Sequence, residues 1–187
     1  MKQNIQPYIE IMDTTLRDGE QTDSVSFVPR EKLNIARLLL QDLNVDRIEV
    51  GSARVSEGER EATRLICHWA EDNAMLNRVE VLGFVDGHLS LDWLNDCGCK
   101  NINLLCKGSL RHCLYQLKKQ PQEHIDDIRR SIDYADRLGI GVNVYLEDWS
   151  SGMKDSPDFV YTMVDALSKE NIRRFMLPDT LGILNPL

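Results

Sequence analysis

The sequence lacks any apolar run long enough to cross a membrane, and its first residues, MKQNIQPYIEIMD, lack the apolar core of a secretory signal peptide. It also lacks an excess of positive charge, because 30 acidic side chains outnumber 22 basic ones and the formal net charge is -8. That balance argues against nucleic acid or an anionic membrane as the main partner. We therefore expect a cytoplasmic protein that binds neither nucleic acid nor membranes.

The common cysteine and histidine motifs are also missing. The five cysteines are an odd number at irregular spacing, and Cys97 and Cys99 form C-x-C rather than the C-x-x-C of redox and zinc sites. None of the four histidines lies two or four residues from another. We therefore expect reduced, mostly buried thiols and no metal site built from paired histidines.

What the sequence does contain is a regular alternation of strand-like and helix-like segments, with no linker or low-complexity tract. Short β-rich runs predict strands at 8–13, 46–52, 78–85, 101–106, 141–148 and 173–179. Apolar residues at helical spacing predict helices at 30–43, 56–73, 90–98, 122–139 and 156–171. Pro29, the Ser56 and Glu59 pair, Gly98, Gly139 and Ser156-Pro157 are typical of helix ends.

Strict alternation of strand and helix predicts a parallel sheet with helices outside it. Both an open doubly wound sheet and a closed (β/α)₈ TIM barrel fit this pattern. Six strands in 187 residues give about 30 residues per unit, and eight units would need roughly 250 residues. We therefore expect residues 1–187 to be the N-terminal part of a catalytic barrel domain, its first six units, interrupted before strand seven.

Polar side chains gather where the predicted strands end. The segment DTTLRDGEQTDS, which follows the first strand, crowds Asp13, Arg17, Asp18, Glu20 and Asp23 together. The ends of parallel barrel strands meet at one rim, where active sites of such barrels lie. The other strand ends deliver further side chains to that rim, most of them polar: Glu49 and Ser52, Phe84 and Asp86, Cys106 and Lys107, Tyr145 with Glu147 and Asp148, and Asp179 with Thr180. An excess of carboxylates there favours a divalent cation with oxygen ligands.

Structural roles compete with this interpretation for several of these side chains. Asp148 and Asp179 are also typical of helix caps. Glu49 lies within an apolar strand, where a carboxylate is costly unless it is paired, so an ion pair with Arg17 is the alternative role. Lys107 is expected to be a solvated loop lysine, although a phosphate-rich cofactor could use it.

Five motifs together resemble a known enzyme family. DTTLRDGEQ, IEVGSARVSEGE, LGFVDG, VYLEDWSSG and LPDTLG occur in the order found in the metal-dependent Claisen-type acyltransferases and lyases built on a TIM barrel. That family includes 2-isopropylmalate synthase, citramalate synthase, homocitrate synthase and hydroxymethylglutaryl-CoA lyase. The resemblance spans nearly all of the chain, and VYLEDWSSG with LGFVDG is most similar to the citramalate and 2-isopropylmalate synthase branch.

The resemblance implies roles for individual residues. It implies that Asp18 is a metal ligand and that Arg17 polarises the keto acid and stabilises the developing oxyanion. It makes Glu147 the candidate general base or its support, and Thr180 the hydroxyl that holds the substrate carboxylate. Leu82, Phe84, Leu105 and Tyr145 would line the pocket for the keto-acid side chain. A supporting shell would consist of Asp13, Glu20, Gln21 and Glu49.

The implied reaction condenses acetyl-CoA with an α-keto acid to a 2-alkylmalate, as in leucine or isoleucine biosynthesis. The resemblance implies a divalent metal, Mg²⁺ or Mn²⁺ with Zn²⁺ as a third candidate, and a homodimer or higher homo-oligomer. The family completes its metal site with H-x-H on the seventh strand, and no H-x-H occurs in this sequence. We therefore expect this segment to be inactive by itself. A hydroxyacyl-CoA lyase and a non-catalytic binding module for keto acids or amino acids are the alternatives.

The acceptor is either pyruvate or 2-ketoisovalerate. If Leu82 and Tyr145 both point into the pocket, they fill the space that an isopropyl group requires, which favours pyruvate by a small margin.

Overall fold

The computed structural model describes residues 8–185. Its parallel strands are β1 (Met12–Asp13), β2 (Arg47–Ser52), β3 (Val79–Phe84), β4 (Asn101–Lys107), β5 (Gly141–Glu147) and β6 (Arg174–Met176). Its α-helices are α1 (Pro29–Arg37), α2 (Glu57–Asp72), α3 (Leu89–Asp96), α4 (Pro121–Leu138), α5 (Trp149–Asp155) and α6 (Pro157–Leu167). Short 3₁₀ turns lie at Gly19–Gln21 and Leu76–Arg78, and single π-helical turns lie at Leu38–Asp42 and His112–Gln116.

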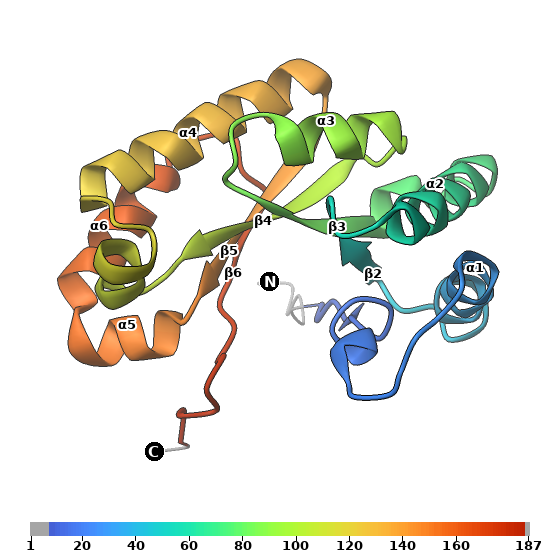
Figure 1. The fold of residues 1–187 in the computed structure, drawn as a ribbon, viewed down its shortest axis with the longest axis horizontal. Coiled ribbons are helices and arrows are strands. Elements are labelled where there is room, and N and C mark those ends of the chain that lie inside the picture. Colours follow the sequence, from blue (N-terminus) through green and yellow to red (C-terminus); the bar gives the residue numbers. More distant parts are fainter. Residues whose placement is uncertain (1–7, 186–187) are drawn as a thin grey trace, which may run out of the picture.

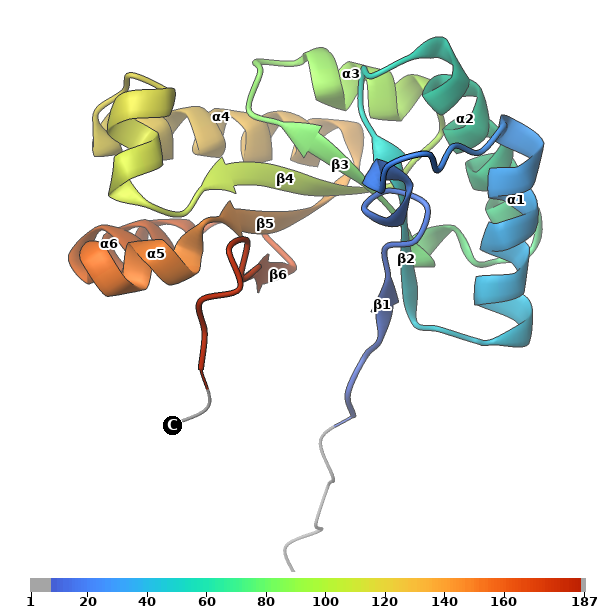
Figure 2. The same cartoon turned by 60° about the horizontal axis from the view of Figure 1, so that its bottom comes forward.

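The strands form one sheet in the sequential order β1-β2-β3-β4-β5-β6, and every neighbouring pair is parallel. A doubly wound sheet requires a point at which the strand order reverses, and a sheet that advances in one direction curls toward a barrel instead. The described chain is therefore a half-barrel, part of a TIM barrel, as the alternation predicted. The helices lie along the outside of the curved sheet, and its concave face is open (Figures 1 and 2).

The two faces of the sheet differ sharply in composition. On β4 and β5 the alternate residues Ile102, Leu104, Val142, Val144 and Leu146 belong to one buried apolar cluster. That cluster also contains the apolar stripe of α4, namely Ile125, Ile128 and Ile132. Because successive strand residues point to opposite faces, the residues between them lie on the concave face, and these are mainly polar or only half-buried. The convex face thus supplies the core, and the concave face is left for other chemistry.

Several helix ends form for the reasons visible in the sequence. α1 begins at Pro29 and α6 at Pro157, where a missing N–H costs no hydrogen bond. The Ser56 hydroxyl accepts the N–H of Glu59 at 3.1 Å and caps α2. α4 ends at Gly139, whose φ of 66° is the left-handed conformation that glycine adopts at least cost.

The structure corrects several predicted boundaries. The first strand was expected at 8–13 and pairs only at Met12–Asp13, and the sixth was expected at 173–179 and pairs only at Arg174–Met176. Each has a partner strand on one side only within residues 8–185, so fewer ladder hydrogen bonds define it. α6 ends at Leu167 rather than at 171. Helix α5 was not predicted, because only seven residues form it and Ser-Ser-Gly weakens its helical signal.

All five cysteines are free and buried, which confirms the prediction of reduced thiols. Burial raises the pKa of the Cys97 thiol to about 11, and it raises the pKa of Cys106 further. These side chains therefore act as small apolar groups of the core. None of the helices among residues 8–185 is both long and apolar enough to span a bilayer.

Replacing His124 by Gln should weaken the acid dependence of stability. His124 lies buried on α4, its Nε2 accepts the N–H of Lys107 at 3.1 Å, and burial lowers its pKa to about 4. An unfolded histidine titrates near pH 6.5, so between about pH 6.5 and 4 only the unfolded state takes up this proton. The free energy of unfolding should therefore fall by up to about 3 kcal/mol across that window as the pH is lowered.

His124→Gln keeps a hydrogen-bond acceptor and removes the titration. In urea unfolding at pH 7 and pH 4.5, the variant should lose less stability on acidification than the wild type. The exposed His68 provides the matched control, because His68→Gln should lose as much as the wild type. Equal losses in the wild type and His124→Gln would contradict this account.

Candidate functional site

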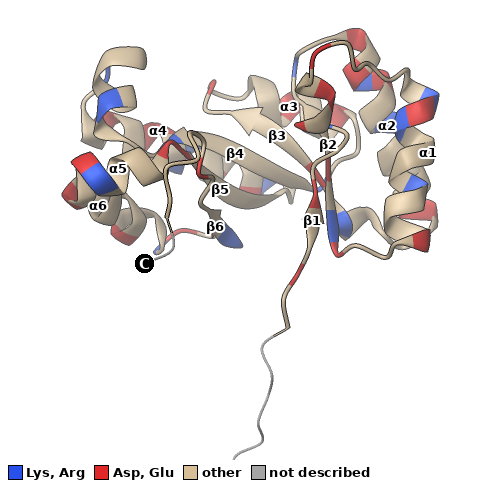
Figure 3. Ribbon diagram, turned by 90° about the horizontal axis from the view of Figure 1, so that it is seen from below, with Lys and Arg blue, Asp and Glu red and all other residues tan. Residues whose placement is uncertain are grey.

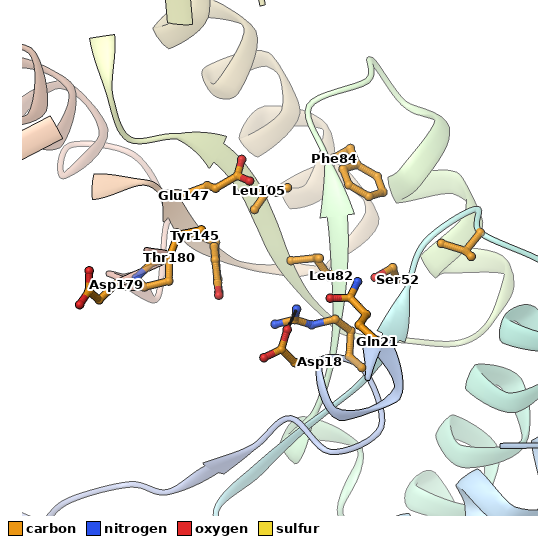
Figure 4. Close-up of a pocket in the computed structure, with 13 residues that line it drawn as sticks. Asp18, Gln21, Ser52, Leu82, Phe84, Leu105, Tyr145, Glu147, Asp179 and Thr180 are labelled. Carbon is orange, nitrogen blue, oxygen red and sulfur yellow. Dashed lines mark hydrogen bonds and ion pairs between the residues drawn. The ribbon is translucent and has the colours of Figure 1, made fainter. Parts of the chain in front are cut away.

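A cavity of about 530 Å³ opens on the concave face, at the carboxyl ends of the strands. Figure 4 shows its wall, with Asp18 and Gln21 on one side and Tyr145, Glu147 and Thr180 on the other. The residues that line it are Arg17, Asp18, Gln21, Ser52, Val55, Leu82, Phe84, Leu105, Tyr145, Glu147, Pro178, Asp179 and Thr180. The structure therefore brings together eleven of the residues singled out from the sequence, drawn from the ends of all six strands.

A tight turn after β1 aims Arg17 and Asp18 into the cavity. The carbonyl oxygen of Thr14 accepts the backbone N–H groups of Arg17, Asp18 and Gly19 at 3.1, 2.8 and 3.1 Å. Leu16 is fully buried behind this turn and anchors it to the core. In Figure 3 the red of acidic residues marks the ribbon at β1 and in the loop that follows it.

A continuous chain of polar contacts crosses the inside of the half-barrel. The Arg17 Nε donates to Glu49 Oε2 at 2.5 Å, and the Asn103 side-chain amide donates to Glu49 Oε1 at 2.6 Å. The Asn143 amide donates in turn to Asn103 Oδ1 at 2.7 Å. Glu49, Asn103 and Asn143 are completely buried, so these partners satisfy groups that water does not reach. The alternative role for Glu49, an ion pair with Arg17, is confirmed.

This chain sets the charge state of its members. Burial raises the pKa of Glu49, and the positive charge of Arg17 and the hydrogen bond from Asn103 offset part of that rise. Burial by itself would lower the pKa of Arg17, but the adjacent Glu49 carboxylate outweighs it and the pKa of Arg17 is raised. Arg17 is therefore a permanent cation at the cavity wall. Its Nη1 donates to Asp18 Oδ1 at 2.8 Å, while its Nη2 donates to no group within residues 8–185.

Three residues of the expected supporting shell do not line the cavity. Glu20 forms an ion pair with the buried Lys32 of α1 at 2.5 Å and accepts the N–H of Phe27, so it ties the loop after β1 to that helix. Asp13 accepts the N–H of Thr15 at 2.9 Å and stabilises its own turn. Glu49 accepts a hydrogen bond from the Arg17 guanidinium and does not itself line the cavity. Gln21, by contrast, lies on the cavity wall.

The opposite wall comes from the ends of β5 and β6. The Thr180 hydroxyl oxygen accepts the backbone N–H of Asp148 at 3.0 Å, so its own hydrogen is left to donate elsewhere. The carboxylate of Asp179 accepts the N–H groups of Ile183 and Leu184 at 3.1 and 2.9 Å. It stabilises a turn, because no helix follows it among residues 8–185. Asp148 precedes α5, but its carboxylate accepts from Ser109 at 2.8 Å rather than from the helix backbone.

Lys107 is not the solvated loop residue that the sequence suggested. It is the last residue of β4, lies opposite Glu147 of β5 in the register, and forms an ion pair with the Glu147 carboxylate. Its side chain is only 14% exposed. The prediction was wrong because it ended the strand at residue 106, and the extra residue places Lys107 within the sheet.

An apolar wall of Leu82, Phe84 and Leu105 closes the cavity between these charged ends. Leu82 and Tyr145 both face the space, as expected (Figure 4). Burial raises the pKa of Tyr145, which stays a neutral hydroxyl at neutral pH. The cavity thus combines a cation, carboxylates and a hydroxyl with a small apolar patch.

One carboxylate on the cavity wall has the chemistry that a hard divalent cation prefers. Asp18 is largely exposed on the cavity wall, and its Oδ2 accepts no hydrogen bond from the residues that the structure describes. A free carboxylate oxygen of this kind is a preferred ligand of Mg²⁺ and Mn²⁺. In the part of the chain from 8 to 185, no group of three His, Cys, Asp or Glu side chains is arranged to hold a metal.

Comparison with known proteins identifies the family. The family described as HMGL-like matches residues 8–187. The chain belongs to the HMGL-like family. This confirms the resemblance that the five sequence motifs carried.

Two named relatives of this HMGL-like chain come from Methanocaldococcus jannaschii. The chain is 33% identical to an (R)-citramalate synthase over 178 residues, which is 95% of this chain and 34% of that protein. It is 37% identical to a 2-isopropylmalate synthase over 184 residues, which is 98% of this chain and 34% of that protein. The chain thus spans about a third of the length of these synthases.

Among solved structures, the hydroxymethylglutaryl-CoA lyase from Pseudomonas aeruginosa superposes with a TM-score of 0.74 at 16% sequence identity. The match covers 95% of this chain and 59% of the lyase chain. It shows that the half-barrel has the fold of this family.

Sequence reasoning placed Ser52 and Lys107 at the rim but missed Asn103, which donates to Glu49. The pattern N-I-N-L-L in β4 contained a signal for Asn103, because a polar residue alternating with buried apolar ones marks the other face of a strand. Nothing local pairs Asn103 with Glu49, since 54 residues separate them.

Removing the Glu49 carboxylate should destabilise the protein. Glu49→Leu leaves the Arg17 guanidinium, which is only 10% exposed, and the Asn103 amide without their shared partner. We expect a loss of about 3 kcal/mol in the free energy of unfolding, the usual cost of breaking a buried pair from one side. Urea unfolding of Glu49→Leu beside the exposed control Glu61→Leu measures it. A loss no larger than that of Glu61→Leu would contradict a central role for Glu49.

Proposed function

We propose that this chain carries the keto-acid side of an acyltransferase site, which condenses acetyl-CoA with a small α-keto acid to a 2-alkylmalate. The observation that carries the proposal is the convergence of Arg17, Asp18, Glu147 and Thr180 around one cavity with a small apolar wall. The named relatives at 33% and 37% identity are a citramalate and a 2-isopropylmalate synthase, which supports this reaction class.

The acceptor would bind through its carboxylate and carbonyl oxygens. The Thr180 hydroxyl has a hydrogen to donate, because its oxygen already accepts from Asp148. The Nη2 of Arg17 is free among residues 8–185 to donate to a carbonyl oxygen, and Glu49 fixes its direction from behind. As the carbonyl becomes an alkoxide, a preorganised guanidinium gains more from the negative charge than from the neutral ketone. Arg17 therefore lowers the barrier rather than merely binding substrate.

A divalent cation, Mg²⁺ or Mn²⁺ before Zn²⁺, belongs to the proposal, with Asp18 as the ligand that this chain supplies. When bound, such an ion would act as a Lewis acid on the keto carbonyl. Arg17 would help to position this ligand, because its Nη1 donates to Asp18 Oδ1 at 2.8 Å and leaves Oδ2 without a hydrogen bond from residues 8–185.

Glu147 is the proposed general base. It would accept a proton from the methyl group of acetyl-CoA, and the resulting carbon nucleophile would attack the keto carbon. Arg17 would stabilise the new alkoxide, and hydrolysis of the thioester would release CoA and the 2-alkylmalate. Tyr145, Leu82, Phe84 and Leu105 would exclude water from the acceptor side chain.

The activity is proposed for the protein expressed from its complete gene, because this chain spans about a third of the synthase relatives. Its place would be the leucine or isoleucine branch of amino-acid biosynthesis, and its assembly a homodimer or higher homo-oligomer. The lyase reaction is a weaker candidate, because the lyase structures are only 16–20% identical to this chain and share its fold.

Arg17→Lys should abolish most of the activity. A lysine ammonium is a point charge and does not reproduce a planar guanidinium held by Glu49 while it also reaches a carbonyl. We expect a loss of at least about 100-fold in kcat, the scale of losing one oxyanion donor. The assay follows CoA release that depends on acetyl-CoA, a keto acid and added Mg²⁺ or Mn²⁺. The exposed Arg30 provides the control variant Arg30→Lys.

A near-normal rate in Arg17→Lys would remove this side chain from the mechanism. Cleavage of a hydroxyacyl-CoA without keto-acid-dependent CoA release would replace the synthase by the lyase.

Leu82 should select the keto acid. Leu82 and Tyr145 occupy the cavity wall, so pyruvate fits better than 2-ketoisovalerate with its two extra methyl groups. We expect the wild type to prefer pyruvate in kcat/KM, and Leu82→Ala to shift the ratio toward 2-ketoisovalerate by about tenfold, equivalent to roughly 1.4 kcal/mol. Leu38→Ala, an exposed position, should leave the ratio unchanged. If the wild type prefers 2-ketoisovalerate, the pocket argument is wrong and a 2-isopropylmalate synthase is indicated.

A further inference from the structure

Lys107 and Glu147 form a pair whose geometry the sheet itself sets. They are the last residues of two adjacent parallel strands and lie opposite each other in the register. Side chains at matched positions of neighbouring parallel strands leave the sheet on the same face. The Lys107 ammonium contacts Glu147 Oε2, and the two side chains are 14% and 26% exposed. The pair is therefore mostly removed from solvent and only weakly screened.

The backbones on both sides of this pair are fixed. The N–H of Lys107 donates to the buried Nε2 of His124 at 3.1 Å, which ties the end of β4 to α4. The next N–H, from Gly108, donates to the carbonyl oxygen of Glu147 at 2.7 Å. A Cβ at Gly108 would lie 2.9 Å from that same oxygen, so only glycine allows this approach. The ion pair is thus held by two rigid strand ends.

The two partners differ in their relation to the cavity. Glu147 lines it, whereas Lys107 is not among the lining residues. Oε2 of Glu147 accepts from Lys107, while Oε1 accepts no hydrogen bond from any residue in the described range 8–185. Lys107 therefore occupies Oε2 of Glu147, and Oε1 is available to a molecule in the cavity.

The surroundings of Glu147 make this counter-ion important. The charged and titratable groups around the cavity are Arg17 and Asp18 after β1, Tyr145 on β5 and Asp179 after β6. His124 lies behind Lys107 and is neutral, because burial lowers its pKa to about 4. The guanidinium of Arg17 is already shared between Glu49 and Asp18. Among residues 8–185, Lys107 is the cation that contacts Glu147.

We propose that Lys107 is a positioning residue for Glu147. The ammonium holds Oε2, so that Oε1 is presented to the cavity as the proton acceptor. In the step it serves, a C–H bond of the acetyl-CoA methyl breaks and the proton bonds to Oε1. The electron pair passes into the thioester enolate, which attacks the keto carbon. This role of Lys107 rests on the proposed function.

The test compares Lys107→Met, Lys107→Arg and the control Lys119→Met in the protein expressed from its complete gene. Lys119 forms a lysine–carboxylate ion pair with Asp127, away from the cavity. Lys119→Met therefore breaks the same kind of ion pair without affecting Glu147. Lys107→Met should lower kcat at pH 7 by about tenfold or more, because an oriented, ionised base is lost. The KM for the keto acid should stay within about twofold, because Arg17 and Thr180 are intact.

The acid limb of the pH profile of kcat should move upward by about one pH unit in Lys107→Met, since a carboxylate that loses a neighbouring cation is protonated more readily. Lys107→Arg should restore most of the rate and the original limb. Lys119→Met should resemble the wild type in all three readouts.

A second measurement is independent of activity. The chain of residues 1–187 is labelled with carboxyl-¹³C glutamate, and the Glu147 resonance is identified as the one missing in Glu147→Gln. Its titration midpoint should rise in Lys107→Met and not in Lys119→Met. If no acyl transfer occurs in the wild type, the proposed function fails while this titration still tests the coupling. An unchanged midpoint, or a lower kcat with an unchanged acid limb, would overturn the proposal.

Discussion

A single buried carboxylate, Glu49, organises the inside of this half-barrel. It lies completely inside the molecule, where an ion is unfavourable unless its oxygens are fully paired. Arg17 comes from the turn after β1 and Asn103 from β4, so satisfying Glu49 joins three parts of the chain that are distant in sequence. The arrangement also leaves Arg17 with one face toward the cavity. The contact that stabilises the interior therefore also orients the cation on which the proposed chemistry depends.

The two faces of the sheet differ in composition, which explains how the protein tolerates a polar interior on the concave face. The convex face buries Ile102, Leu104, Val142 and Val144 beneath α4, which supplies the apolar burial that a parallel sheet needs. The concave face is thus released from forming the core and holds polar side chains, of which Glu49, Asn103 and Arg17 are paired with one another. The same two-residue period that buries one set of side chains places Leu82, Leu105, Tyr145 and Glu147 around one cavity.

The fold match and the sequence relatives give different kinds of information about function. The solved lyase structures share the half-barrel at 16–20% identity, so they establish the scaffold and leave the reaction open. The synthase relatives are more similar in sequence, at 33% and 37% identity. In this chain the reaction would depend on the side chains at the cavity, among them Glu147 with its partner Lys107 and the apolar wall at Leu82.

The sequence by itself determined the order of strands and helices, the buried thiols, the family, and the cluster of Arg17, Asp18, Glu147 and Thr180 at one rim. The family follows from the resemblance of five short motifs, and the other features follow from local periodicity, residue spacing and strand ends. All of these are short-range properties of the chain. Only the tertiary structure decided that Glu20 pairs with Lys32 rather than supporting the cavity, that Asn103 supports Glu49, and that Lys107 faces Glu147. The extents of β1 and β6 and the presence of α5 were also decided there. The physical reason is that the partner of a charge is chosen by the register of strands tens of residues apart, which no local pattern specifies.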